Sequence, residues 1–190
     1  SDELKAAGIA PHHVLPGVGR NLIEHHCISA NWHAAPGVVR EETPYIQVVL
    51  SCTAPGSPIR NDMQSFLSQT QDQPSLHLRW HLMKPHSRGS IRIHSADPLA
   101  APDIRLNLAS DPEDLRRLAH GLQMVGALAA TPQMQAFGAQ SLTLGDGETL
   151  TVQSFADRLR DEVWVREHVQ RSVVHYVHPV GSARMGPAND

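Results

Sequence analysis

Apolar and polar residues alternate along much of the first half of this chain, and a two-residue period is typical of strands with one buried face. The pattern predicts strands over residues 27–33, 45–50, 63–68 and 76–82. In the last of these, Leu76, Leu78, Trp80 and Leu82 are expected to face a core, with the intervening side chains on the opposite face.

Apolar residues return after the turn at residues 84–89, over residues 90–94. We expect residues 76–82 and 90–94 to form an antiparallel hairpin, since a short polar turn separates them. Nearer the C-terminus, the β-branched run at residues 172–177 predicts a buried strand.

The second half of the chain has the three- and four-residue spacing of amphipathic helices. A helix is predicted from Pro112 to Ala130, because Ser110 and Asp111 can cap it and Thr131-Pro132 ends it. Further helices are predicted over residues 2–7, 132–137 and, with Ser154 as the cap, 155–168.

These elements predict an α+β fold. We expect an antiparallel sheet of about five or six strands, covered on one face by the helices that begin at Pro112 and Phe155. The other face would line a cavity, with His178 at the edge of the sheet.

Composition excludes several classes of protein. The chain has 190 residues, 41% hydrophobic and 18% charged, with a net charge of −3. It has no basic stripe for nucleic acid and no apolar run of about 20 residues that would span a bilayer. The opening SDELK has no signal-peptide character, and two cysteines, Cys27 and Cys52, make no disulfide framework. We therefore expect a cytoplasmic protein, either free or at the periphery of the inner membrane.

The candidate for catalysis is His178, in the string His178-Pro179-Val180-Gly181. Proline holds the residue before it in an extended conformation, and an imidazole on a stiff backbone at a strand end suits acid–base chemistry near neutral pH. The alternative is an ordinary surface or core histidine, of which a chain with 13 histidines has several.

Other possible sites are weaker. His77 and His81 are four residues apart, which on a strand is about 13 Å, so we expect no metal site there. Gly17-Val18-Gly19 lacks the third glycine and the acidic residue of a dinucleotide-binding loop. No Gly-x-Ser-x-Gly string of a serine hydrolase occurs.

Four strings, in order, resemble the glucose–methanol–choline (GMC) flavoprotein oxidoreductases. They are DELKAAGI, LPGVGRNLIEH, the Ser-Arg-Gly turn of PHSRGSIRIHSADP, and HPVGSARMG, where Ser182 replaces the usual threonine. In the second string Asn21 and His25 match the family pattern, and Glu24 stands where aspartate is common. We expect Arg88 and Gly89 of the third string to shape a turn rather than to contact substrate.

The resemblance implies FAD-dependent oxidation of an alcohol to an aldehyde or ketone, most like the choline dehydrogenase branch. His178 matches the histidine that accepts the hydroxyl proton, while Pro179, Val180 and Gly181 would lie beside the flavin. The family's Gly-x-Gly-x-x-Gly unit is absent from these residues.

We therefore expect a fragment of a longer enzyme. Residues 1–26 would link to the flavin-binding domain, residues 27–177 would form the substrate-binding domain, and residues 178–190 would begin the active-site segment. Its partners would be a small alcohol and the flavin-binding domain of the same polypeptide. The chain alone would neither bind FAD tightly nor turn over, and its exposed surface could drive self-association.

Two hypotheses from other classes remain open at this point. One is a stand-alone, non-catalytic module that binds a small molecule. The other is a histidine-rich metalloprotein.

Overall fold

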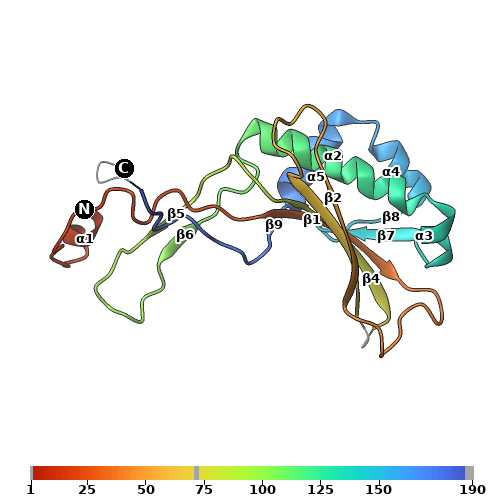
Figure 1. The fold of residues 1–190 in the computed structure, drawn as a ribbon, viewed down its shortest axis with the longest axis horizontal. Helices are drawn as coiled ribbons and strands as arrows, with labels where there is room; N and C mark the ends of the chain where they lie inside the picture. Colours follow the sequence, from red (N-terminus) through yellow and green to blue (C-terminus); the bar gives the residue numbers. More distant parts are fainter. Residues whose placement is uncertain (1, 71–72, 187–190) are drawn as a thin grey trace.

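A computed structural model describes residues 2–70 and 73–186. The molecule is elongated: a sheet with helices lies at one end, and a narrower arm carries both termini at the other (Figure 1). Residues 71–72, between the strands predicted over residues 63–68 and 76–82, and residues 187–190 of the segment predicted to begin at His178 lie outside the described residues.

The main sheet contains seven strands among the described residues, in the order β2-β3-β4-β1-β7-β8, with β9 also paired to β1. All its pairings are antiparallel. The strands are β1 (His26–His33), β2 (Ile46–Cys52), β3 (Met63–Thr70), β4 (Ser75–Leu82), β7 (Ser141–Leu144), β8 (Thr149–Thr151) and β9 (Val174–His175). The α+β prediction and its four long strands are confirmed, while the short strands β7 and β8 were not predicted.

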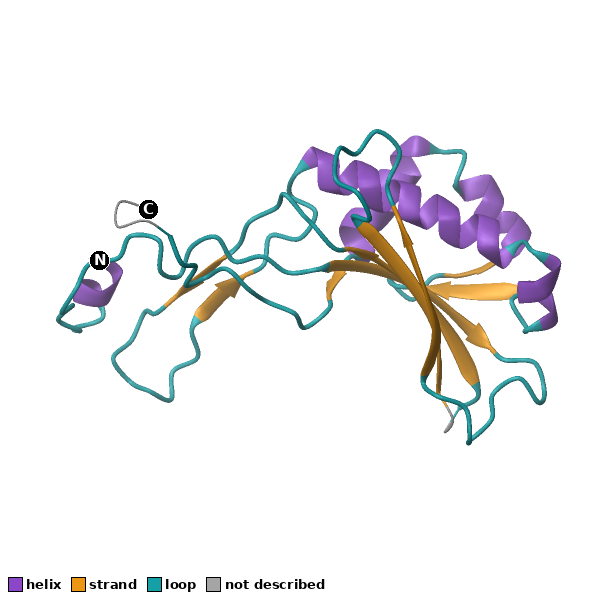
Figure 2. Cartoon of the chain, viewed as in Figure 1, coloured by secondary structure: helices purple, strands orange, loops and turns teal. Residues whose placement is uncertain are grey.

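Three helices cover one face of this sheet (Figure 2): α2 (Pro112–Ala129), α4 (Val152–Arg158) and α5 (Glu162–Ser172). The short helices are α1 (Asp2–Ala6) and α3 (Pro132–Ala136). The prediction of a single helix over residues 155–168 is wrong, because helix α4 ends at Arg158 and a second helix, α5, begins at Glu162. The Asp161 carboxylate accepts hydrogen bonds from the backbone of Val163 and Trp164 and so begins a new helix.

The core lies between α2 and β4, as the sequence pattern predicts. Leu78, Trp80 and Leu82 of β4 are buried, and so are Leu118 and Leu122 of α2. The helix lies so close to the sheet that a Cβ at Gly121 would be 2.5 Å from the indole of Trp80. This contact requires glycine and fixes the distance between the two layers.

The predicted hairpin between residues 76–82 and 90–94 is wrong. Both edges of β4 are already paired along its length, with β1 and with β3, so the chain leaves the sheet after Leu82. It returns as β5 (Ser90–Arg92), which pairs with β6 (Asp103–Arg105) in a separate two-stranded sheet of the arm.

The strand predicted at residues 172–177 is much shorter than expected and is not buried. Only Val174 and His175 pair with β1, next to the part of β1 that β7 occupies, and Val174 remains 47% exposed. The following residues therefore leave the sheet at its edge, as predicted for His178.

A buried ion cluster joins α2 to the loops around β4. The guanidinium of Arg117 donates to Asp62 at 2.9 Å and to Asp114 at 2.7 Å, and all three side chains are at most 1% exposed. Burial alone would raise the pKa of Asp114, but the backbone N–H groups of His86 and Ser87, which also bond to its carboxylate, lower it overall.

We expect Arg117→Met to lower the free energy of unfolding by about 3–5 kcal/mol, because it leaves two buried carboxylates without their cation. Urea denaturation of the 190-residue chain measures this change. Arg116→Met is the matched control: Arg116 also pairs with an acid, Glu113, but is exposed, and should change stability by less than about 1 kcal/mol. Similar losses in the two variants would contradict this account.

Candidate active site

Three of the strings singled out in the sequence meet in the arm, beside the edge of the main sheet. Residues 19–23 form the central segment of a small ribbon of backbone hydrogen bonds. On one side, Leu22 and Gly89 exchange N–H···O bonds of 3.1 and 2.8 Å, and Ile91 donates to Gly19 at 2.7 Å. These bonds join the Gly-Arg-Asn-Leu string to the Ser-Arg-Gly turn.

On its other side, the central segment of the ribbon pairs with the segment that follows His178. Ile23 and Val180 exchange two N–H···O bonds of 2.8 Å, and Gly19 donates to Ser182 at 2.7 Å. The side-chain amide of Asn21 donates to the carbonyl of Gly181 at 3.4 Å. The turn after His178 is thus fastened at several points to residues near the N-terminus.

Arg88 stabilises the ribbon from within, as predicted. Its guanidinium donates to Asn21 Oδ1 at 2.9 Å and also to three carbonyls of its own turn, those of Pro85, His86 and Ser87. At Gly89 a Cβ would lie 2.1 Å from the carbonyl oxygen of Arg105, so only glycine fits there. Both residues serve the turn.

Glu24 connects the ribbon to the candidate base, a role that its sequence context alone does not indicate. Its side chain is buried, and its carboxylate accepts hydrogen bonds from the backbone of His25 at 2.6 Å and of His178 at 2.9 Å. A buried carboxylate is stabilised by such N–H donors. One acidic side chain therefore brings the backbones of two histidines together.

The imidazole of His178 is exposed and is flanked by two aromatic rings. The ring of His25 lies edge-on at 5.3 Å between centroids, with the two Nδ1 atoms 3.4 Å apart, and the ring of Tyr176 lies edge-on at 5.1 Å. Burial, together with the neighbouring His178, lowers the pKa of His25. His178 thus has a fixed position and an accessible ring, which are the properties required of a general base.

His81 lies behind this group and has a different role. Its ring stacks on Phe66 at 4.8 Å and contacts Tyr176 at 4.1 Å, and neither ring nitrogen has a hydrogen-bonding partner. Burial lowers the pKa of His81 to about 4, so the ring is neutral near pH 7. It forms part of an aromatic wall rather than a reactive group.

The backbone before His178 is strained. Val177 has φ of 55°, a left-handed conformation that β-branched residues rarely adopt, and its side chain is 70% exposed. Such a conformation persists only where surrounding contacts impose it, and these cluster at functional sites. Here the contacts are the bonds from Glu24 to His178 and from Ile23 to Val180.

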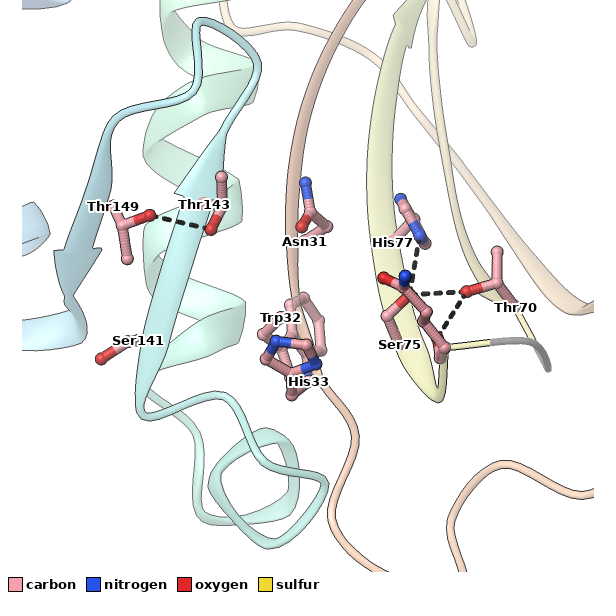
Figure 3. A pocket seen from close by; sticks show the side chains of 10 residues that line it. Asn31, Trp32, His33, Thr70, Ser75, His77, Ser141, Thr143 and Thr149 are labelled. Carbon is pink, nitrogen blue, oxygen red and sulfur yellow. Dashed lines mark hydrogen bonds between the residues drawn. The ribbon is translucent and has the colours of Figure 1, made fainter.

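A polar cavity of about 630 Å³ lies elsewhere on the sheet, between β4, β1 and β7 (Figure 3). His77 lines it, hydrogen-bonded to Ser75 at 3.0 Å, whereas His25, Tyr176 and His178 do not. Among the described residues, two groups of acidic and histidine side chains lie close enough to share a cation: His86-Asp111-Asp114 and Asp146-Glu148-His168. Neither group contains His77 or His81.

The two cysteines are free. Cys27 is buried in β1, and burial raises the pKa of its thiol to about 12, which makes it a core residue rather than a nucleophile. Among the helices that the structure describes, none is both long and apolar enough to cross a membrane.

Comparison with known proteins places this chain among flavoprotein relatives. The family model described as GMC oxidoreductase, which represents the C-terminal domain, matches residues 85–190. The chain is 31% identical to 5-(hydroxymethyl)furfural oxidase of Methylovorus sp. (strain MP688), with 99% of this chain and 37% of the relative aligned. It is 26% identical to the oxygen-dependent choline dehydrogenase of Staphylococcus aureus, where 100% of this chain aligns with 37% of the relative.

Solved structures share the fold. Pyridoxine 4-oxidase from Mesorbium loti matches 97% of this chain and 36% of its own length, with a TM-score of 0.76 and 18% identity. Formate oxidase of Aspergillus oryzae RIB40 matches 96% of this chain and 40% of its own, with a TM-score of 0.73 and 17% identity. The chain thus spans little more than a third of the length of these relatives.

Val177→Gly should raise the free energy of unfolding by about 1 kcal/mol, because relief of the left-handed strain exceeds the entropy that glycine adds to the unfolded chain. Val174→Gly is the control: this nearby exposed valine lies in β9, and its loss should destabilise by about 1 kcal/mol. Urea denaturation compares the two. Destabilisation of equal size in both variants would contradict the interpretation that the backbone of Val177 is strained.

His81 should make folding stability fall as the solution is acidified. The unfolded chain protonates this histidine near pH 6.5, whereas the folded chain does so only near pH 4. Its stabilising contribution is therefore complete above about pH 6.5 and is lost progressively as the pH falls to about 4, by up to about 3 kcal/mol.

Urea denaturation at several pH values tests this, with His81→Phe as the variant, since phenylalanine keeps a ring against Phe66 and Tyr176. His26 and His168, whose pKa values burial also lowers, contribute in the same direction in both proteins. The variant should therefore lose less stability between pH 6.5 and pH 4 than the parent. Identical pH dependence would show that His81 is not the cause.

Proposed function

Because this chain belongs to the GMC oxidoreductase family, we propose that it supplies the substrate-binding part of an FAD-dependent enzyme that oxidises an alcohol to an aldehyde. The observation that carries the proposal is the placement of His178. Its ring is exposed, its backbone N–H is bound to the buried carboxylate of Glu24, and the turn after it is paired to the ribbon.

In this proposal His178 is the general base. Oxidation of an alcohol removes a proton from oxygen and a hydride from carbon, and FAD, when bound, accepts the hydride. His178 takes the hydroxyl proton on a ring nitrogen that faces the substrate. Tyr176, Phe66 and His81 form an uncharged wall beside it that limits the entry of water.

The residues around His178 fit the flavin ring. Val177 and Val180 are 70% and 60% exposed and form an apolar surface next to the imidazole, which suits a flat heterocycle. The N–H of Val180 is already bonded to Ile23, so Pro179 and Val180 would contact the ring by packing. The carbonyl of Gly181 is likewise bonded, to Asn21.

The rest of FAD needs residues that this sequence does not contain. No Gly-x-Gly-x-x-Gly loop is present to bind the diphosphate at a helix N-terminus. We therefore propose that residues 1–26 link to a flavin-binding domain of the same polypeptide, that residues 27–177 form the substrate-binding domain, and that residues 178–190 begin the active-site segment.

On this basis the 190-residue chain by itself would be inactive. Its natural partners would be a small alcohol and the flavin-binding domain, and without that domain the exposed apolar residues of the arm, among them Val18 and Ile104, would favour self-association. The free thiols of Cys27 and Cys52 suit a cytoplasmic location.

The first experiment is an absorption spectrum of the purified 190-residue chain after incubation with FAD and desalting. We expect a colourless protein, because these residues hold at most one side of the flavin. A retained flavin spectrum would contradict the proposal that the diphosphate site lies in another part of the polypeptide.

The second experiment replaces His178 by alanine in the flavin-loaded enzyme that contains this chain. Turnover of its alcohol substrate should fall at least about a hundredfold, since general-base catalysis is worth roughly that much, while the flavin spectrum stays unchanged. His175→Ala, which removes a nearby exposed imidazole, should leave turnover unaltered. Unchanged turnover in His178→Ala would remove the assignment of His178 as the base.

A further inference from the structure

The hydrogen bond between His25 and His178 requires a proton on one of the two facing nitrogens and none on the other. Their Nδ1 atoms are 3.4 Å apart, and two imidazole nitrogens can form a hydrogen bond only if one carries the proton and the other accepts it. The two rings stand at 86° to each other, so the lone pair of one nitrogen can be directed at its neighbour. The protonation of the two rings is therefore coupled: when one Nδ1 carries the proton, the other is the acceptor.

Glu24 makes this arrangement rigid. Its carboxylate accepts hydrogen bonds from the backbone of both histidines, with 2.6 Å to His25 and 2.9 Å to His178. Burial and His178 lower the pKa of His25, and the charge of Glu24 opposes that shift. The negative charge stabilises a proton held between the two Nδ1 atoms.

Only one of the two proton positions suits a base. If His25 donated, His178 would carry its own proton on Nε2 and would have no free nitrogen for the hydroxyl proton of an alcohol. If His178 donates from Nδ1, its exposed Nε2 is a free acceptor.

We propose that His25 is a positioning residue, whose neutral Nδ1 accepts the Nδ1–H of His178 and holds His178 in the tautomer with a free Nε2. The inference rests on the proposed function of His178 as a base. When Nε2 takes the proton of the alcohol, the resulting imidazolium keeps its Nδ1–H bond to His25, and no further proton has to move. The logic is that of the buried carboxylate that orients the histidine of a serine protease, with an imidazole in its place.

The first test is a tautomer measurement that needs neither flavin nor substrate. Long-range ¹H–¹⁵N correlation spectra of the ¹⁵N-labelled 190-residue chain at pH 8.5 report which nitrogen of each neutral histidine is protonated. The signals of His178 are assigned by their absence in His178→Ala. We expect His178 to carry its proton on Nδ1, and His25 to carry its proton on Nε2.

Two variants of His25 separate positioning from folding. Phenylalanine keeps the ring but cannot accept, so His178 should lose its preference for the Nδ1–H form. Asparagine places an oxygen near the position of Nδ1 and should preserve that preference. The control is His175→Phe. His175 lies in β9, and its replacement should leave the tautomer of His178 unchanged.

The outcomes are distinct. An Nε2–H form of His178 in the parent chain, or an unchanged Nδ1–H form in His25→Phe, would overturn the inference. If His25→Phe does not fold, His25→Asn provides the test: loss of the Nδ1–H form of His178 in that variant would overturn the inference. In the flavin-loaded enzyme, His25→Phe should lower kcat at least tenfold and His25→Asn by less. Full activity of His178→Ala would instead overturn the proposed function of His178 as a base. The measured tautomer of His178 would not be affected by that result.

Discussion

The buried carboxylate of Glu24 is the interaction on which the candidate site depends. A charged group removed from water must be satisfied by donors, and here the donors are backbone N–H groups of two segments from opposite ends of the chain. Because the acceptor is fixed in the ribbon, the position of His178 follows from backbone geometry rather than from side-chain packing. The left-handed Val177 is the local cost of that geometry.

The main sheet supports this arrangement from one side. β1 begins at His26, directly after the two residues that bind and flank His178, and β9 pairs with the same end of β1. The packing of Gly121 on Trp80 and the ion cluster around Arg117 hold α2 against β4 and so keep β1 in place. The site is thus an extension of the sheet edge, with aromatic rings filling the space between the two.

Signals that are local in sequence could be predicted, and pairings that are distant could not. The alternation in β4 and the helical spacing in α2 allowed those elements to be predicted, because burial of one face produces such a periodicity in the sequence. The hairpin after β4 was wrong because alternation says nothing about which strand is the neighbour. The helix break at Asp161 was missed because apolar residues continue at helical spacing across it. His178 was selected as a candidate from its proline and from the family resemblance, whereas its partner Glu24 lies 154 positions away. The sequence offered one indication of Glu24: an acidic residue stands at this position, before His25, in the family pattern.

That separation of 154 positions also orders events during synthesis and folding. Strands β1 to β4 and helix α2 are complete by residue 129, so these elements can pack together while the C-terminal segment is still on the ribosome. Glu24 has no backbone donor from His178 until the last tenth of these residues has been made. The contacts of the site span almost the whole chain, and closing so long a loop is slow compared with local folding. The contact between Glu24 and His178 is therefore among the last parts of this structure to form, on strands that have already paired.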